Sequence, residues 1–314
     1  GGGLSAAIEA VNDGAQSVIV LEKTGKTGGS LNFTSGSMSG AETVIQKIDG
    51  IEDTKESFVQ DILNNGAHLG NEAMIRAFVD EDVDAIQWLW DNGLSEYNFS
   101  SMKTTGKHTV FAPEHQLYSV ARTYKPSAND PTRYKAAAHE IMDTVLATDA
   151  YKGVTIDFNT TANQLVANEQ GQVLTVLATD ENGQTVRYEA KKAVIMATGG
   201  FSANVQMRET QVPYLTEELP TTNIKAASTG EGIYLAQAIG ANTTQMSNIQ
   251  RYPWADPNTG VLDKYAVWPF TGPSYGVIYV DYNGNRYVNE GDRRDVCANA
   301  AVNTGFVSTY AIFT

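Results

Sequence analysis

The sequence begins with Gly1-Gly2-Gly3-Leu4-Ser5-Ala6-Ala7, and this stretch decides the fold. Three glycines before an apolar, helix-forming pattern are typical of a tight turn that leads into a helix. Glycine lets the backbone approach a bound group closely, and the first N–H groups of the helix carry partial positive charge that favours an anion. The stretch therefore predicts a phosphate-binding turn at the start of a helix over residues 4–12.

A strand and a carboxylate complete the pattern. Residues 17–21 (SVIVL) are apolar and β-branched, as in a strand, and Glu22 follows 19 residues after Gly3. A carboxylate at this place accepts hydrogen bonds from ribose hydroxyls, so the set predicts a dinucleotide site. The strand that should precede the glycines is missing, and there is no initiator Met. We therefore expect the chain to be a fragment.

Composition excludes several classes of protein. The 314 residues are 42% hydrophobic and 18% charged, which favours a globular enzyme, and the net charge of −14 argues against a nucleic-acid partner. A single cysteine, Cys297, excludes an internal disulfide and is expected to be a buried apolar side chain, and four scattered histidines predict no metal site. No apolar stretch reaches transmembrane length. Localisation stays open between the bacterial cytoplasm and export.

Helical and strand patterns alternate beyond residue 22. A helix is predicted at 72–92, with an apolar face made of Ile75, Phe78, Val79, Val83, Ile86, Leu89 and Trp90. Strands are predicted at 154–158, 174–177 and 186–190, the last two joined as a hairpin around residues 181–183 (ENG). Residues 193–197 (AVIMA) predict a buried parallel strand that runs into Thr198-Gly199-Gly200, and such an end is typical of a ligand edge.

Six motifs now form an ordered set: residues 1–7 (GGGLSAA), 21–23 (LEK), 28–30 (GGS), 35–38 (SGSM), 197–201 (ATGGF) and 229–232 (TGEG). The set resembles the flavoprotein family of fumarate reductase and succinate dehydrogenase, and most of all its soluble reductases of fumarate, urocanate and related unsaturated acids. The likeness covers nearly the whole chain. It implies an α/β fold, with a Rossmann-like FAD-binding domain at 1–246, lacking its first strand and C-terminal return, and an incomplete capping domain at 247–314.

The resemblance implies FAD as the cofactor. The residues that match the family's FAD contacts are Gly1, Gly3, Ser5, Glu22, Lys23, Gly28, Gly29, Ser30, Ser35, Gly36, Val166, Thr198, Gly199 and Glu231. Glu22 would bind the adenosine ribose and Val166 would meet the adenine, while Gly29, Ser30 and Gly36 would follow the isoalloxazine ring. Taken singly, Gly199 could only be part of a tight strand exit, and Glu231 an ordinary acid in a helix first turn.

The family likeness also predicts how FAD is held. Membrane-bound members of the family tether FAD covalently through a histidine near the segment that contains Ser30. None of the four histidines of this chain lies there. FAD is therefore expected to be non-covalent.

Residues 286–295 (RYVNEGDRRD) resemble the segment that carries the catalytic arginine of these reductases, and the matching residue is Arg294. From charge alone, Arg293 and Arg294 among Glu290, Asp292 and Asp295 would form an ion-pair network in solvent. The resemblance implies instead that a hydride passes from flavin N5 to the carbon β to the substrate carboxylate, and that Arg294 gives a proton to the α carbon. A guanidinium in a dry cleft would also stabilise the developing negative charge.

Tyr252 is the position that best distinguishes substrates. Fumarate reductases carry a histidine here that helps to bind a carboxylate, whereas urocanate-type reductases carry tyrosine. The family's Thr-Glu-Ala-Val-Arg-Gly proton relay has no counterpart at 263–275, where Phe270 and Tyr275 stand. Aromatic side chains stack on flat rings, so we expect an imidazole-bearing or aryl acrylate rather than fumarate. The alternative is that these aromatic residues only pack the capping domain.

The electron donor and two other activities stay open. The family implies an upstream haem or FMN domain, or a partner protein, as the donor. The same fold serves 3-ketosteroid dehydrogenases and aspartate oxidases, in which tyrosine rather than arginine would be the key acid or base. A third possibility is a non-catalytic flavin-binding fragment or electron carrier. The family's remaining substrate ligands would fall beyond Thr314, so the fragment by itself is expected to be inactive.

Overall fold

Two compact units make up the structure, and each is built from separated stretches of the chain. The computed structural model describes residues 1–33, 38–92, 100–101, 118–125, 145–221, 225–253, 255, 260, 277–306 and 308–312. Unit 1 comprises residues 1–33, 145–249 and 259–261, and unit 2 comprises residues 34–144, 250–258 and 262–314. Unit 2 thus joins residues 34–144 to the C-terminal stretch, while the division into domains at 1–246 and 247–314 stays a prediction.

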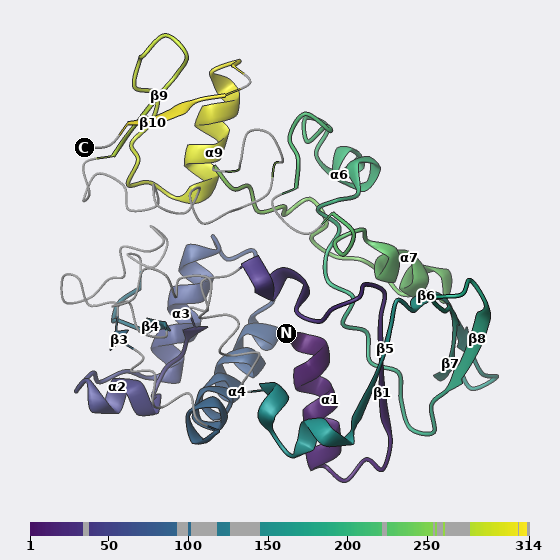
Figure 1. The fold of residues 1–314 in the computed structure, drawn as a ribbon. Helices are drawn as coiled ribbons and strands as arrows, with labels where there is room; N and C mark the ends of the chain where they lie inside the picture. Colours follow the sequence, from purple (N-terminus) through teal and green to yellow (C-terminus); the bar gives the residue numbers. More distant parts are fainter. Residues whose placement is uncertain are drawn as a thin grey trace. The chain divides into compact units, whose positions relative to one another are not determined.

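A parallel pair of strands beside a helix forms the centre of unit 1. Helix α1 spans Gly2–Asn12, β1 spans Val18–Glu22, and a short 3₁₀ helix, η5 (Ala150–Gly153), leads into β5 (Val154–Phe158). β1 and β5 pair in parallel, with Glu22 opposite Phe158, and α1 lies beside both strands (Figure 1). The predicted helix at 4–12 and the predicted strands at 17–21 and 154–158 are confirmed.

An antiparallel sheet follows β5 in unit 1. Its strands are β6 (Thr161–Ala167), β7 (Val173–Thr179) and β8 (Thr185–Glu189), in the order β6-β7-β8. In the turn between β7 and β8, the Asp180 carboxylate accepts hydrogen bonds from two backbone N–H groups, and Gly183 takes the positive φ of 76° that the turn requires. The predicted hairpin is confirmed.

Residues 193–197 differ from their prediction. They belong to no strand, and most of their side chains are exposed, including Ile195 with 62% of its surface accessible. The sheet that contains β1 has only two strands in the part of the chain that the structure describes, so no partner strand pairs with this run. The apolar composition was a sound signal for a strand, but a strand also needs a hydrogen-bonded neighbour. The prediction of a buried parallel strand is therefore wrong.

Two helices of unit 1 follow the motifs at 197–201 and 229–232. α6 spans Val205–Gln211 and α7 spans Glu231–Ala238. The Asn204 side chain caps α6 by accepting a hydrogen bond from the Met207 N–H, and it also donates to the Thr229 carbonyl at 3.1 Å. This contact links the start of α6 to the residues just before α7.

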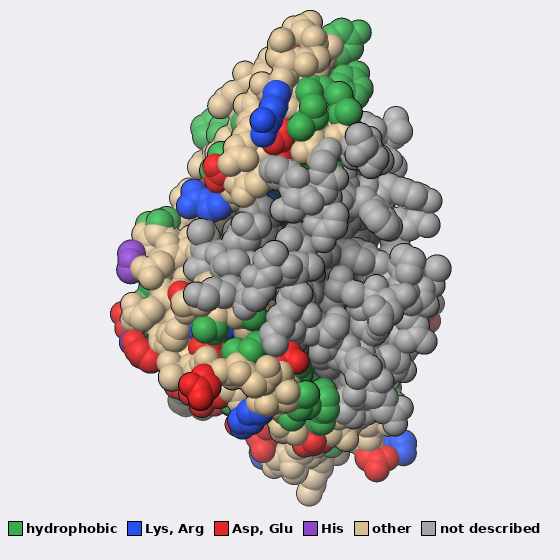
Figure 2. Space-filling view, turned by 90° about the vertical axis from the view of Figure 1, so that its left-hand side faces the viewer, with side chains coloured by type: hydrophobic (Ala, Val, Ile, Leu, Met, Phe, Trp, Pro, Cys, Tyr) green, Lys and Arg blue, Asp and Glu red, His purple; other side chains and the backbone are tan. Residues whose placement is uncertain are grey.

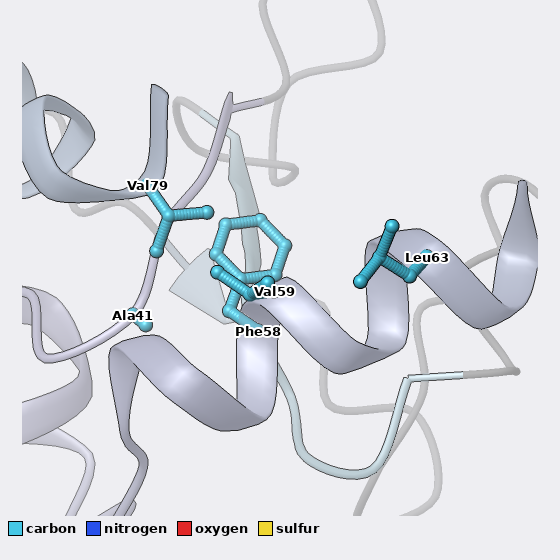
Figure 3. Close-up of a cluster of buried hydrophobic side chains, with 5 residues drawn as sticks. All are labelled: Ala41, Phe58, Val59, Leu63 and Val79. Atoms are coloured by element: carbon cyan, nitrogen blue, oxygen red, sulfur yellow. The ribbon is translucent and has the colours of Figure 1, made fainter. Parts of the chain in front are cut away.

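Three helices pack together in unit 2. They are α2 (Val44–Ile48), α3 (Lys55–Asn65) and α4 (Glu72–Asp91), and their N-caps are Thr43, Thr54 and Asn71, each accepting a backbone hydrogen bond. Figure 3 shows their apolar contact: Phe58, Val59 and Leu63 of α3 lie with Val79 of α4 and with Ala41. Unit 2 also contains a small sheet of three short strands in the order β2-β4-β3. These strands are β2 (Met38–Ser39), β3 (Ser100–Ser101) and β4 (Thr123–Lys125).

The buried face of α4 was predicted only in part. Val79, Ile86 and Leu89 are buried as expected, whereas Phe78 is 55% exposed and its ring lies at a steep angle to that of Phe58, with 6.3 Å between the centroids. The sequence did not predict that Asp82 would be buried on the same face, with 6% of its surface accessible. A charged residue in a helix is assigned to the solvent side when only the sequence is known, because the sequence does not show what packs against that residue.

Arg122 lies fully buried in unit 2 between two carboxylates. Its Nε and Nη2 donate to Asp53 at 2.6 and 2.7 Å, and its Nη1 donates to Asp61. Phe58 and Tyr118 cover the guanidinium, with ring centroids 5.0 and 5.6 Å from its Cζ. The charge is thus paired, hydrogen-bonded and enclosed, which is the arrangement that a buried arginine requires.

The C-terminal part of unit 2 places a helix on a strand pair. β9 (Ile278–Val280) and β10 (Tyr310–Ile312) pair antiparallel, and α9 spans Arg294–Asn303. Cys297 of α9 is 1% exposed and packs with Val277 and Tyr279, so its prediction as a buried apolar side chain is confirmed.

The described part of the chain contains no membrane-spanning helix and no cluster of metal-ligating side chains. On the face shown in Figure 2, Lys and Arg side chains lie singly among Asp and Glu side chains. None of the described helices has the length and apolar composition needed to span a bilayer. Within the described ranges, no group of three or more His, Cys, Asp and Glu side chains is placed to hold a metal ion.

Asp82 makes stability depend on pH. Neither of its carboxylate oxygens has a hydrogen-bond partner among the described residues. Burial raises the pKa of Asp82 to about 7, although the positive charge of Lys55 acts in the opposite direction. The folded protein therefore holds a proton that the unfolded chain has lost, and stability falls as pH rises from the ordinary value near 4 towards 7.

Replacement of Asp82 by asparagine, which has nearly the same shape and does not ionise, should remove this dependence. Relative to wild type, we expect the Asp82→Asn variant to gain about 3 kcal/mol in free energy of unfolding between pH 5 and pH 8, measured by urea denaturation. Asp84→Asn, at an exposed position of the same helix, is the control and should show no such gain. Identical pH profiles for wild type and Asp82→Asn would contradict the raised pKa.

Candidate functional site

The glycine turn forms the N-terminus of α1. Gly1 is the N-cap, its carbonyl accepts hydrogen bonds from Leu4 and Ser5 N–H, and no side chain caps the helix. The Ser5 hydroxyl also reaches the Gly1 carbonyl, at 3.4 Å. The N–H groups of Gly2 and Gly3 precede the first intrahelical bond, so they are donors that a helix start offers to an anion.

Glu22 lies at the end of β1. One oxygen of its carboxylate, Oε1, accepts hydrogen bonds from the backbone N–H and the hydroxyl of Thr24, both at 2.8 Å. Its own carbonyl accepts from Thr160 N–H at 3.0 Å, which ties the end of β1 to the residues after β5. The two bonds from Thr24 hold the Glu22 carboxylate in place within the turn that follows β1.

Lys23 joins the end of β1 to the start of α7. Its Nζ lies 2.6 Å from Glu231 Oε2 and 2.7 Å from the Thr229 hydroxyl. Glu231 is the first residue of α7, and the N-cap Gly230 has a φ of 74°. The two motifs, which lie more than two hundred positions apart in sequence, are therefore brought into direct contact.

Thr198 and Gly3 bring a third segment to the same place. A Cβ at Gly232 would collide with the Thr198 side chain, and a Cβ at Gly3 would lie only 3.4 Å from the Ala197 Cβ. Gly200 accepts a backbone hydrogen bond from Gly230 at 3.2 Å. The turn after residue 197 therefore lies between the starts of α1 and α7, where glycines make room for it.

For the remaining predicted FAD contacts of unit 1, the structure gives the backbone conformation or the secondary-structure element of each residue. Gly28 and Gly29 have φ angles of 112° and 51°, and a 3₁₀ helix, η1 (Gly29–Phe33), contains Ser30. Gly199 also has positive φ, at 74°. Val166 is half-buried in β6 opposite Thr175 of β7. Ser35 and Gly36 lie outside the described residues.

Sequence reasoning missed two members of this cluster. Thr229 had no assigned role, yet it accepts a hydrogen bond from Lys23, and Gly232 provides the space for Thr198. The signal was present, because both residues belong to the TGEG motif at 229–232. The sequence could not show which residue of the motif faces which neighbour.

Arg294 and Tyr252 lie together in unit 2. Arg294 is the first residue of α9, and its Cζ lies over the Tyr252 ring, 5.8 Å from the centroid. This distance is within the range of a cation–π interaction. Arg294 is half-buried. The predicted catalytic residue and the predicted substrate-binding residue are thus in contact.

The neighbouring charges pair differently from the network expected from charge alone. Arg293 binds Asp295 at 3.1 Å, and Glu290 binds Arg286 at 2.5 Å. Burial tends to raise the pKa of Glu290, but hydrogen bonds from Arg286 and from the Tyr279 N–H hold it below its usual value. Phe270 and Tyr275, the other aromatic residues of the prediction, lie outside the described residues.

The residues of unit 1 fit FAD by their chemistry. Uncapped N–H groups at a glycine turn suit a diphosphate, and a carboxylate at the end of the next strand suits ribose hydroxyls. At Gly1, Gly2, Gly199 and Gly200 a Cβ would meet no atom within 4 Å, so the turns leave open space beside their backbone. A large planar cofactor needs such space next to its hydrogen-bond donors.

Comparison with known sequences establishes the family. The sequence model of the FAD binding domain matches residues 1–308, so the chain belongs to this family and FAD is the cofactor that the family indicates. The acrylate reductase flavoprotein subunit of Shewanella woodyi is 32% identical over 311 residues, covering 96% of this chain and 57% of the relative. The urocanate reductase of Eggerthella lenta is 31% identical over 304 residues, covering 96% and 46%.

A third relative is similar in sequence, and two solved structures have a similar fold. The NADH:fumarate oxidoreductase of Klebsiella pneumoniae is 31% identical over 313 residues, covering 100% of this chain and 31% of the relative. The open conformation of a flavocytochrome c3 fumarate reductase has a TM-score of 0.77 at 24% identity, covering 95% of this chain and 48% of that one. A 3-ketosteroid-Δ4-(5α)-dehydrogenase from Rhodococcus jostii RHA1 has a TM-score of 0.68 at 27% identity, covering 93% and 59%.

The motif-based resemblance and the mixed α/β fold with FAD as cofactor are therefore confirmed. This chain spans between 31% and 57% of the length of the three relatives described above. The individual residue roles stay predictions.

Glu22 provides the test of the cofactor site. If its carboxylate binds the ribose, Glu22→Ala in the whole protein should weaken FAD binding about 10- to 100-fold, because a hydrogen bond to a charged group is lost. The measurement is a titration of apoprotein with FAD, followed by flavin fluorescence. Glu9→Ala, at an exposed position of α1, is the control. An unchanged dissociation constant in Glu22→Ala would rule out the ribose contact.

Proposed function

We propose that the whole protein is an FAD-dependent reductase that saturates the C=C bond of an unsaturated carboxylate. The observation that carries the proposal is the contact between Arg294 and Tyr252, at 5.8 Å from Cζ to ring centroid. It places the proposed proton donor, a permanent cation, beside an uncharged side chain at the position where fumarate reductases carry a histidine. The acrylate, urocanate and fumarate reductases among the relatives support the reaction class.

Arg294 is the proposed proton donor. The hydride for the new C–H bond, at the carbon β to the carboxylate, would come from reduced FAD when the cofactor is bound. As the C=C π bond breaks, its electron pair moves to the α carbon, where Arg294 delivers the proton. A guanidinium gives up a proton reluctantly, so its fixed positive charge next to the developing carbanion is part of its role.

Tyr252 supports an aromatic acrylate over fumarate. Tyrosine at this position offers no positive charge to a second carboxylate. Fumarate has two carboxylates, whereas urocanate and cinnamate have one carboxylate and one ring. We therefore propose a urocanate-like or aryl-acrylate-like substrate. FAD would be bound non-covalently, and the electrons would come from a haem-type or FMN-type domain or a partner protein.

A steroid dehydrogenase is the second candidate. The likeness to the 3-ketosteroid-Δ4-(5α)-dehydrogenase, at 27% identity over 93% of this chain, favours it. A reaction of that kind would remove hydrogen from the substrate rather than add it. The presence of an arginine at position 294 supports the reductase instead, because a steroid dehydrogenase is expected to use tyrosine as its key acid or base.

A substrate panel on the full-length protein separates these candidates. With reduced viologen as the donor, we expect turnover of urocanate or cinnamate to exceed that of fumarate and methacrylate. A 3-ketosteroid with an acceptor dye is the parallel assay. Turnover of the steroid alone would replace the reductase proposal, and flavin binding without turnover in either assay would favour a non-catalytic flavoprotein.

Arg294 should be essential for turnover. Because positioned proton transfer contributes about 10²- to 10⁴-fold in rate, Arg294→Lys and Arg294→Ala should lower kcat by that factor while FAD content is unchanged. Steady-state kinetics with the preferred substrate provide the measurement. Arg293→Gln is the matched control, since Arg293 is the adjacent arginine and pairs with Asp295. Near-full activity in Arg294→Lys would show that another group is the acid.

A further inference from the structure

The backbone of Arg294 is fixed by the helix that it begins. Cys297 and Ala298, three and four positions further along α9, are buried, so the helix face that includes Arg294 is held against the core around Tyr279. The helix does not fix the Arg294 side chain in the same way. An arginine side chain has many accessible rotamers, and helix formation alone does not orient its guanidinium.

Of the three carboxylates closest to Arg294 in sequence, two bind other arginines, and the third, Asp292, accepts a hydrogen bond from the Arg293 backbone N–H at 2.8 Å. Asp295 binds Arg293 at 3.1 Å, and Glu290 accepts from Arg286 at 2.9 and 2.5 Å while also accepting from the Tyr279 N–H. These pairs keep two negative charges of the segment engaged beside Arg294.

Tyr252 contacts the guanidinium in a way that suits a proton donor. The Cζ of Arg294 lies over the ring at 5.8 Å from its centroid. The negative face of an aromatic ring attracts the cation, whereas the five N–H donors of a guanidinium point outward in its plane. A ring can therefore hold the group without accepting a conventional hydrogen bond from each of its donors.

We propose that Tyr252 is a positioning residue for Arg294: its ring, rather than its hydroxyl, holds the guanidinium in the orientation from which it serves the substrate. This inference rests on the proposed reductase function. It assigns Tyr252 a role different from the direct substrate contact that the sequence predicted. It also provides a reason for an aromatic side chain at this position that is independent of the shape of the substrate.

Two substitutions separate the ring from the hydroxyl. Tyr252→Leu removes the ring and should lower kcat about 3- to 30-fold, the range that corresponds to a cation–π interaction, with KM within about twofold of wild type. Tyr252→Phe keeps the ring, and its kcat should lie within about twofold of the wild-type value. Tyr282→Leu, at a tyrosine of the same unit that is 68% exposed, is the control and should behave as wild type.

The opposite pattern would overturn the inference. A substrate contact through the hydroxyl predicts that Tyr252→Phe loses as much as Tyr252→Leu, with KM raised in both variants. Wild-type kinetics in Tyr252→Leu would equally exclude a positioning role.

A structural measurement keeps this test separate from the proposed function. Crystal structures of the full-length Tyr252→Phe and Tyr252→Leu variants should show Arg294 in its wild-type rotamer in the first and displaced in the second. If the wild-type protein reduces no unsaturated acid, the reductase proposal fails, but these structures still test whether Tyr252 orients Arg294. An unmoved Arg294 in Tyr252→Leu would contradict the inference whatever the activity.

Discussion

Close approach between backbone segments is the constraint on which the cofactor site depends. The start of α1, the end of β1, the turn after residue 197 and the start of α7 meet, although they are far apart in sequence. The turn after residue 197 can approach α7 because no side chain stands at Gly232, where a Cβ would collide with Thr198. Lys23 then joins two of the segments through Glu231 and Thr229. Because that ion pair is partly exposed, its contribution to stability is modest, and its main effect is to fix the position of the turn.

Buried charge shapes unit 2 in two different ways. Arg122 is enclosed with two carboxylate partners and two aromatic rings, so the desolvation of its charge is offset by hydrogen bonds and by the rings. Asp82 is buried without such partners, and it responds by holding its proton. Similar burial thus leads to a permanent ion in one case and to a titratable group near neutral pH in the other, and the difference lies in the neighbouring groups.

The fold alone does not decide the chemistry, because fumarate reductases and steroid dehydrogenases have similar structures. In the proposed function, the choice between reduction and dehydrogenation depends on a few side chains, and two of them, Arg294 and Tyr252, are in contact. If Arg294 is the acid and Tyr252 orients it, as we propose, a change at Tyr252 affects turnover even though its ring does not touch the substrate.

The sequence by itself determined the cofactor family, the helix at the glycine turn, strands β1 and β5 and the β7–β8 hairpin. These features depend on local patterns and on motifs whose order is preserved. Tertiary structure alone decided that residues 193–197 form no strand, that Asp82 is buried, that Lys23 meets Glu231, and that Arg294 lies over Tyr252. The physical reason is that a side chain's partners come from segments distant in sequence. Periodicity reports which face of an element is apolar, but it does not report what lies opposite that face.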